Sequence, residues 1–158
     1  TYFPYVTMPI LPIRIWGDPI LTRRAQAVDK ITTEERKLIA DMKETMASLD
    51  GAGLAAPQVG VSKRIFVFRR GDDVHAIINP RILRREGGRK TDTEGCLSIP
   101  GVQAKVTRYK RITINGRDEK GNTITLECED GDDATLTLLS ELDRLWRADP
   151  MIGAANQS

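Results

Sequence analysis

One helix-forming segment followed by a succession of strand-forming segments constrains the fold of this 158-residue chain more than any other feature. Between residues 32 and 51 apolar side chains recur at helical spacing, whereas the later segments are short apolar runs separated by turn-forming residues. Strands around a helix, with little regular alternation of strand and helix, indicate an α+β domain.

The helix is expected to begin at Thr32 or Thr33, because Thr32 and Glu35 form a capping-box pattern. Four apolar residues then share one face at helical spacing: Leu38, Ile39, Met42 and Met46. Such a stripe indicates core packing rather than a cofactor site. We expect the helix to end at Asp50-Gly51, where the glycine adopts the left-handed conformation that closes a last turn.

Strand and turn patterns fill the chain from the end of this helix to residue 128. The expected strands are residues 64–68, 74–79, 102–106, 111–115 and 122–128. Pro80 is expected to end the second strand, Gly87-Gly88 to form a loop, and residues 118–122 to form a hairpin turn. The single histidine, His75, falls on the less buried face of its strand, which is typical of a surface or hydrogen-bonded residue rather than a metal ligand.

A second helix is expected near the C-terminus. An aspartate in the run Asp130-Gly131-Asp132-Asp133 offers a cap for its first turn. Leu138, Leu142 and Leu145 share one stripe of the segment that follows. The sequence therefore predicts a helix that ends before Asp149-Pro150.

Composition and charge argue against several classes of protein. The net charge is only +2, with basic and acidic residues interspersed, which argues against a nucleic-acid partner. No apolar run approaches the roughly 20 residues of a membrane span, and no secretory signal is visible. Two cysteines, Cys96 and Cys128, are too few for a disulfide framework, so a reducing compartment is expected. Residues 1–158 are interpreted as a single domain, with residues 1–7 as an extension.

Three segments carry the chemistry. They read GAGLAAPQ at residues 51–58, EGCLS at residues 94–98 and SELDRL at residues 140–145. Together they resemble the signature motifs of the peptide deformylases, which hydrolyse the formyl group from the N-terminal methionine of new proteins. The resemblance covers residues 12–127 without strain. It implies a peptide deformylase-like α+β fold, with mixed or antiparallel sheets around a central helix that carries the third motif.

The resemblance also implies a metal site. In the family the third motif is His-Glu-x-x-His, and its histidines join the cysteine of the second motif on one divalent iron, nickel or zinc ion. Cys96 corresponds to that cysteine, and Glu141 to the glutamate that takes a proton from metal-bound water. Gln58 and the backbone N–H of Leu97 are expected to stabilise the developing oxyanion.

Substrate binding follows from the same resemblance. Gly53 and Gly95 are expected to pair with the substrate backbone, so that the peptide is held like an added strand. The residues implied in binding are Gly51, Ala52, Gly53, Leu54, Glu94, Gly95 and, at the methionine pocket, Leu136. The implied partners are formyl-methionyl peptides and, by family analogy, the ribosome. The expected location is the bacterial cytoplasm, with an organelle as the alternative.

Residues 129–158 diverge from the family pattern. Ser140 and Arg144 stand where the two histidines should be, and neither a neutral hydroxyl nor a protonated guanidinium is a suitable ligand for zinc or ferrous iron. A register shifted by one residue places Leu139 and Asp143 there instead and removes the glutamate as well. Either register predicts that a metal is absent or weakly bound. Relaxed function and compensating reading-frame changes in the gene both account for such a local cluster.

Three hypotheses about activity remain open. In the favoured one, a deformylase-fold protein has lost its metal and most hydrolytic activity and still binds peptide N-termini. Arg144 then either places its guanidinium near the vacated metal position, beside Cys96 and Glu141, or points to solvent. In the second, an active deformylase completes its metal site with Glu141, Asp143 or His75. In the third, Cys96 is a nucleophile and Glu141 its base.

Overall fold

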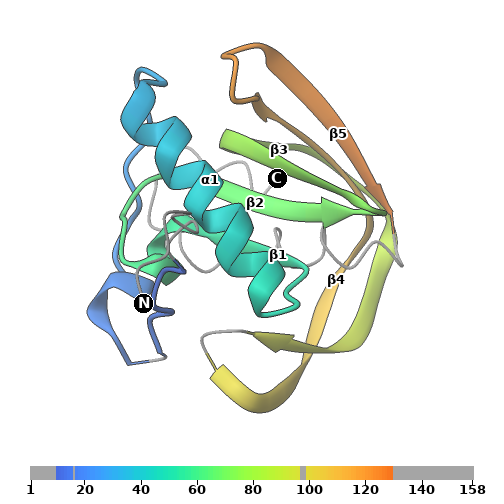
Figure 1. Cartoon of the computed structure of the whole chain (residues 1–158). Coiled ribbons are helices and arrows are strands. Elements are labelled where there is room, and N and C mark those ends of the chain that lie inside the picture. Colours follow the sequence, from blue (N-terminus) through green and yellow to red (C-terminus); the bar gives the residue numbers. More distant parts are fainter. Residues whose placement is uncertain (1–9, 16, 97–98, 130–158) are drawn as a thin grey trace.

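A computed structural model describes residues 10–15, 17–96 and 99–129 (Figure 1). Within the stretch 89–110 it describes the backbone alone. The helices are η1 (Pro19–Leu21), α1 (Thr33–Ser48) and η2 (Ala56–Val59), where η marks a 3-10 turn. The strands are β1 (Gly53–Ala55), β2 (Ile65–Arg70), β3 (Asp73–Cys96), β4 (Ile99–Arg117) and β5 (Thr123–Glu129). The predicted C-terminal helix lies outside the described residues.

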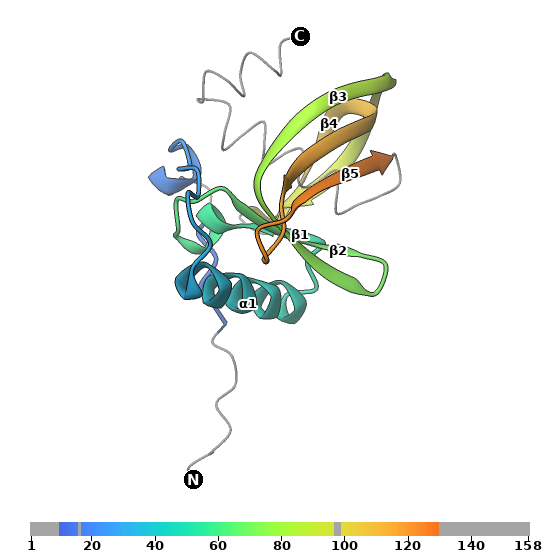
Figure 2. The same ribbon diagram turned by 90° about the horizontal axis from the view of Figure 1, so that it is seen from above.

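The strands form one antiparallel sheet in the order β1-β2-β3-β4-β5. Each strand pairs with the next along the chain, so the sheet is a meander. With α1 against β1 and β2, this arrangement confirms the α+β class (Figure 2). In the described part of the chain, no helix has both the length and the apolar character needed to span a membrane.

Both ends of α1 are held by local hydrogen bonds. The predicted partnership of Thr32 and Glu35 is confirmed, since the Thr32 N–H and hydroxyl donate to Glu35 Oε1 at 2.8 and 2.5 Å. At the other end Gly51 N–H donates to the Met46 carbonyl, at 2.9 Å. The left-handed residue of this closing turn is Asp50, with φ of 52°, so the prediction that Gly51 takes that conformation was wrong by one position.

Strand β2 has a continuous apolar run because it is buried on both faces. Ile65 and Val67 belong to a cluster with the buried side chains of α1, Ile39, Met42 and Met46. The opposite face forms a second cluster, which consists of Leu21, Ala25, Ala55, Phe66, Phe68, Ile77, Ile82, Ile112, Ile114 and Cys128. The helical stripe predicted to be core is therefore confirmed as core.

Strand β3 does not end at Pro80. Ile78 pairs with Arg117 and Arg81 with Asn115, so Asn79 and Pro80 together oppose one residue of β4. This is a β-bulge, and it accommodates a proline because the ladder is interrupted there. Pro80 therefore bends the strand locally and leaves its pairing with β4 intact on both sides.

The loop predicted at Gly87-Gly88 is wrong, because the structure has another bulge of β3 there. Glu86 pairs with Arg111 and Arg89 with Tyr109, so the two glycines lie within β3. Their φ values of 80° and 73° are the left-handed conformation that glycine adopts without strain. The two strands expected at 102–106 and 111–115 are accordingly parts of one strand, β4, and the β3–β4 hairpin is long and strongly curved (Figure 1).

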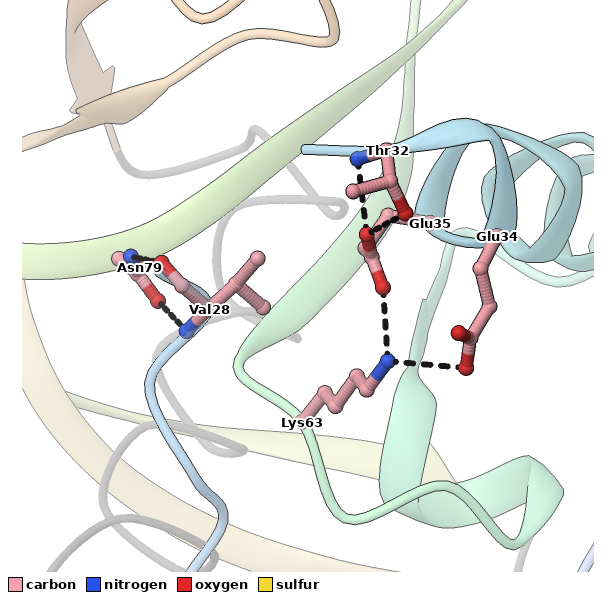
Figure 3. Close-up of polar contacts among 6 residues, drawn as sticks. All are labelled: Val28, Thr32, Glu34, Glu35, Lys63 and Asn79. Carbon is pink, nitrogen blue, oxygen red and sulfur yellow. Dashed lines mark hydrogen bonds and ion pairs between the residues drawn. The ribbon is translucent and has the colours of Figure 1, made fainter. Parts of the chain in front are cut away.

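Polar contacts attach the segment before α1 to the sheet (Figure 3). The Asn79 amide accepts from Val28 N–H at 2.8 Å and donates to the Val28 carbonyl at 2.7 Å. The same carbonyl accepts from Arg117 Nη2 at 2.6 Å. Asn79 has a φ of 53°, a conformation that asparagine tolerates better than most residues.

Lys63 joins α1 to the segment that leads into β2 (Figure 3). Its Nζ lies 2.8 Å from Glu35 Oε2 and 3.3 Å from Glu34 Oε1. The hydrogen bonds that Glu35 accepts lower the pKa of its buried carboxyl to about 2. The bond from Lys63 has the largest effect, and the bonds from Thr32 add to it. The hydrogen bond to Glu35 in turn raises the pKa of Lys63.

Candidate active site

The first motif follows directly from the end of α1. It forms β1 and then η2, and residues 53–59 are all buried. Gln58 lies on η2 with only 2% of its surface exposed. Its Oε1 accepts a hydrogen bond from Ala55 N–H at 2.9 Å, which fixes the amide so that its donor, Nε2, lies at the opposite end.

β1 is an edge strand, with β2 as its partner in the described sheet. Gly53 pairs with Phe68, and Arg69 N–H donates to the Ala52 carbonyl on the adjacent position at 2.9 Å. In an antiparallel ladder this makes Gly53–Phe68 a non-hydrogen-bonded pair. The Gly53 N–H and C=O are therefore directed away from β2, where an added strand would pair with them.

Residues 94–96 of the second motif form the end of β3. Glu94 pairs with Ala104, Gly95 with Gln103 and Cys96 with Ile99, with a register shift between Gly95 and Cys96. The structure thus places the backbone of residues 94–96 where β3 ends, paired with the start of β4. The side chains of Glu94 and Cys96 and all of Leu97 are outside the described parts.

The third motif is also outside the described residues. This holds for Ser140, Glu141 and Arg144, and for Leu136 at the expected methionine pocket. The structure therefore brings together the residues of the first motif, Gly51 to Gln58, and places the second motif by its backbone. The roles expected of the remaining residues stay predictions.

The His75 side chain is exposed, although the same face of β3 also carries the buried Ile77. Its ring packs against Phe68 with a centroid distance of 5.5 Å. Among the residues whose side chains are described, no three or more His, Cys, Asp or Glu residues are grouped as a metal site would require. His75 is thus an exposed residue whose ring packs on the buried Phe68.

Sequence reasoning missed a contact behind Gln58. Arg14 N–H donates to the Gln58 carbonyl at 2.7 Å, and its guanidinium lies against Gly60, which ends η2. Arg14 is held in turn by Asp18, with 3.0 Å between Nη1 and Oδ2. The only sequence signal nearby is the turn pattern Gly17-Asp18-Pro19, which does not indicate a distant partner.

These features describe an α+β protein that presents the main chain of an edge strand beside a buried, oriented glutamine. The sequence model of the family described as polypeptide deformylase matches residues 10–145, and the chain belongs to this family. The match extends through the divergent third motif.

Similar sequences and solved structures support the same family. The chain is 45% identical to the peptide deformylase of Halothermothrix orenii over 77% of this chain and 80% of that protein. It is 42% identical to the peptide deformylase of Acetivibrio thermocellus over 87% of this chain and 79% of that protein. The crystal structure of peptide deformylase from Thermotoga maritima superposes with a TM-score of 0.82 at 39% identity, over 87% of this chain and 92% of that one.

The donor set does not fit the divalent metal on which the family depends. The resemblance implies a thiolate and two imidazoles on the ion, whereas the residues expected at these positions in this chain are Cys96, Ser140 and Arg144. A serine hydroxyl is a poor ligand, and an arginine guanidinium has no lone pair to give and carries a positive charge. The alternative register, with Leu139 and Asp143, supplies only one further donor.

Proposed function

We propose that this chain binds peptide N-termini at the deformylase site and has little or no hydrolytic activity. The observation that carries the proposal is the donor set, because a lone cysteine does not retain a catalytic ion. Amide hydrolysis in this family depends on a metal that activates water, and no residue present replaces that role. Glu141 then has no acidified water from which to take a proton.

The backbone of β1 supports the binding part of the proposal. Gly53 directs its N–H and C=O away from β2, so one residue of an extended peptide is proposed to pair there through two hydrogen bonds. Beyond it, Ala55 N–H is already bonded to Gln58 Oε1. Gln58 therefore occupies the next pairing position on the edge of β1 and leaves one position, Gly53, for a ligand. One position suits the binding of a peptide end better than the pairing of a long strand.

Each remaining residue has a proposed role at the same site. Gln58 Nε2 and Leu97 N–H donate to the formyl oxygen, and Gly95 pairs with the far side of the peptide. The wall around the ligand is proposed to consist of Gly51, Ala52, Leu54, Glu94 and Leu136. The ligand class is thus a formyl-methionyl peptide, the substrate class of the family.

The test combines turnover with metal content. The purified chain is incubated with a formyl-Met tripeptide in the presence of nickel, ferrous iron or zinc, and its bound metal is measured by mass spectrometry. We expect substoichiometric metal and turnover no faster than the no-enzyme control, together with saturable peptide binding. Chelator-sensitive turnover by the unaltered chain would defeat the proposal.

A matched variant restores the missing ligands. The double substitution Ser140→His and Arg144→His rebuilds the family motif around Glu141. We expect this variant to bind about one metal ion and to gain deformylase activity. The double substitution Leu139→His and Asp143→His is the control for register, and activity in that variant alone would show that the shifted register is correct.

Three broader features belong to the same proposal. We treat residues 1–158 as a single domain with a divergent stretch at 129–158 and an extension at 1–7. The site of action is proposed to be the bacterial cytoplasm, where the family processes nascent chains. Ribosome association stays a prediction, which co-sedimentation of the chain with ribosomes would check.

A further inference from the structure

We infer that Arg14 is a positioning residue for the Gln58 amide. The inference rests on the proposed function in one respect, namely that Gln58 is the group that meets the formyl oxygen. The geometry of the contact itself is independent of what the site binds.

Two of the hydrogen bonds that hold Gln58 lie within the described part of the chain. Its main-chain carbonyl accepts from Arg14 N–H at 2.7 Å, and its Oε1 accepts from Ala55 N–H at 2.9 Å. The hydrogen bond from Arg14 holds the main chain of η2, and the hydrogen bond from Ala55 holds the side-chain amide of Gln58. The orientation of Nε2 therefore depends on how firmly Arg14 holds the turn.

The guanidinium of Arg14 packs against the same turn, η2. A Cβ built on Gly60 would lie 2.7 Å from Nη2, 3.0 Å from Nε and 3.1 Å from Cζ of Arg14, so the guanidinium occupies the space that a side chain would take. Gly60 has a φ of 89° and ends η2. The absence of a side chain at this position is what allows the guanidinium to lie against the turn.

Asp18 keeps the guanidinium in place. Asp18 Oδ2 lies 3.0 Å from Arg14 Nη1, and Asp18 Oδ1 accepts from Ile20 N–H at 3.1 Å. Asp18 N–H also donates to the Ile15 carbonyl at 3.0 Å. One carboxylate thus caps η1 and orients Arg14, which connects two 3-10 turns across the back of the site.

Amide hydrogen exchange tests this arrangement directly. The exchange rate of Ala55 N–H reports the bond to Gln58 Oε1, and Val67 N–H in the β1–β2 ladder serves as a reference in the same sample. We expect Arg14→Ala to raise the Ala55 rate relative to Val67 by about fivefold, the size expected for a well-oriented but partly exposed ion pair. Because both rates come from one sample, the Val67 rate reports a general loss of stability separately from the change at Ala55.

Companion variants separate the side-chain contacts. Asp18→Asn keeps an acceptor for Ile20 N–H and removes the charge that orients Arg14, so it is expected to give a smaller increase in the same direction. Arg36→Ala, at an exposed arginine on α1, is the control and is expected to leave the ratio unchanged. An unchanged ratio in both Arg14→Ala and Asp18→Asn overturns the inference.

A binding measurement connects the contact to function. The affinities for a formyl-Met peptide and the same peptide without the formyl group are compared by calorimetry. We expect Arg14→Ala to reduce the preference for the formyl group about fivefold while the affinity for the unformylated peptide stays the same. A preference retained in full by Arg14→Ala overturns the inference, whereas no binding by the parent chain defeats the proposed function and leaves the exchange ratio to decide.

Discussion

Gly116 is the residue of β4 that lies opposite the Asn79-Pro80 bulge of β3. A Cβ at this position would lie 2.6 Å from Ile77 Cγ1 and 2.9 Å from the Ile78 carbonyl oxygen, and the second of these is backbone that cannot rotate away. We expect Gly116→Ala to lower the free energy of unfolding by about 2–3 kcal/mol through overpacking. Urea denaturation measures the change. Gly121→Ala is the control, because its φ of 88° is strained but nothing lies within 4 Å, and it is expected to lose only about 1 kcal/mol; equal losses would contradict the steric argument.

Glu35 makes the stability depend on pH in a defined window. Because the folded pKa is about 2, below the ordinary value of 4.5, the carboxylate stabilises the fold above pH 4.5 and this contribution is lost as the pH falls toward 2. We expect Glu35→Gln to lower the free energy of unfolding at pH 7 by about 1–2 kcal/mol, discounted for the partial exposure of Lys63. The difference between parent and variant should shrink between pH 4.5 and 2.

The control for Glu35 is the neighbouring carboxylate. Glu34 lies 3.3 Å from the same Lys63 but is 78% exposed, so Glu34→Gln is expected to change the stability by no more than about 0.5 kcal/mol. Chemical denaturation of the three proteins at pH 7, 4 and 2.5 gives the comparison. A constant difference between parent and Glu35→Gln across that range would show that Glu35 has an ordinary pKa.

At the scale of elements, the bulge in β3 and the segment before α1 stabilise each other. Asn79 forms two hydrogen bonds with Val28 and has a positive φ, so Asn79→Ala loses both bonds and strains the backbone. We expect a loss of about 3 kcal/mol in the free energy of unfolding. Asn79→Gly loses the same bonds without the strain, and it should be about 1 kcal/mol more stable than Asn79→Ala in thermal or urea unfolding. If the alanine variant were the more stable one, the left-handed backbone would not be costing anything.

At the scale of the whole molecule, metal binding and stability are linked. A ligand that binds only the folded state raises its stability by about 2.7 kcal/mol at a concentration 100-fold above Kd. We expect nickel to leave the melting temperature of the unaltered chain unchanged, because in the proposed function Ser140 and Arg144 do not complete a site with Cys96. The variant with both histidines restored should melt several degrees higher with nickel, and a chelator should reverse the shift. Stabilisation of the unaltered chain would show that other ligands complete the site.

Local signals determined much of this protein from its sequence. The start of α1 depends on Thr32 and Glu35, three residues apart, and the β4–β5 turn on residues 118–122, whose Asp118 N–H donates to the Asn122 carbonyl. The family also follows from short motifs, and the proposal that the metal ligands are lacking rests on residue types, because ligand chemistry belongs to the residue type. These features need no knowledge of distant partners.

Tertiary structure alone decided the features that depend on a distant partner. From the sequence, Pro80 and Gly87-Gly88 are typical of the ends of strands. In the structure β3 pairs with β4 on both sides of each, so both sites are bulges within one strand. Arg14 bonds to Gln58 because the tertiary structure places the segment before η1 beside η2, far from it in sequence. Hydrogen bonds between strands and between segments far apart in sequence outweigh the local preferences of proline and glycine, and no pattern within a few residues reports them.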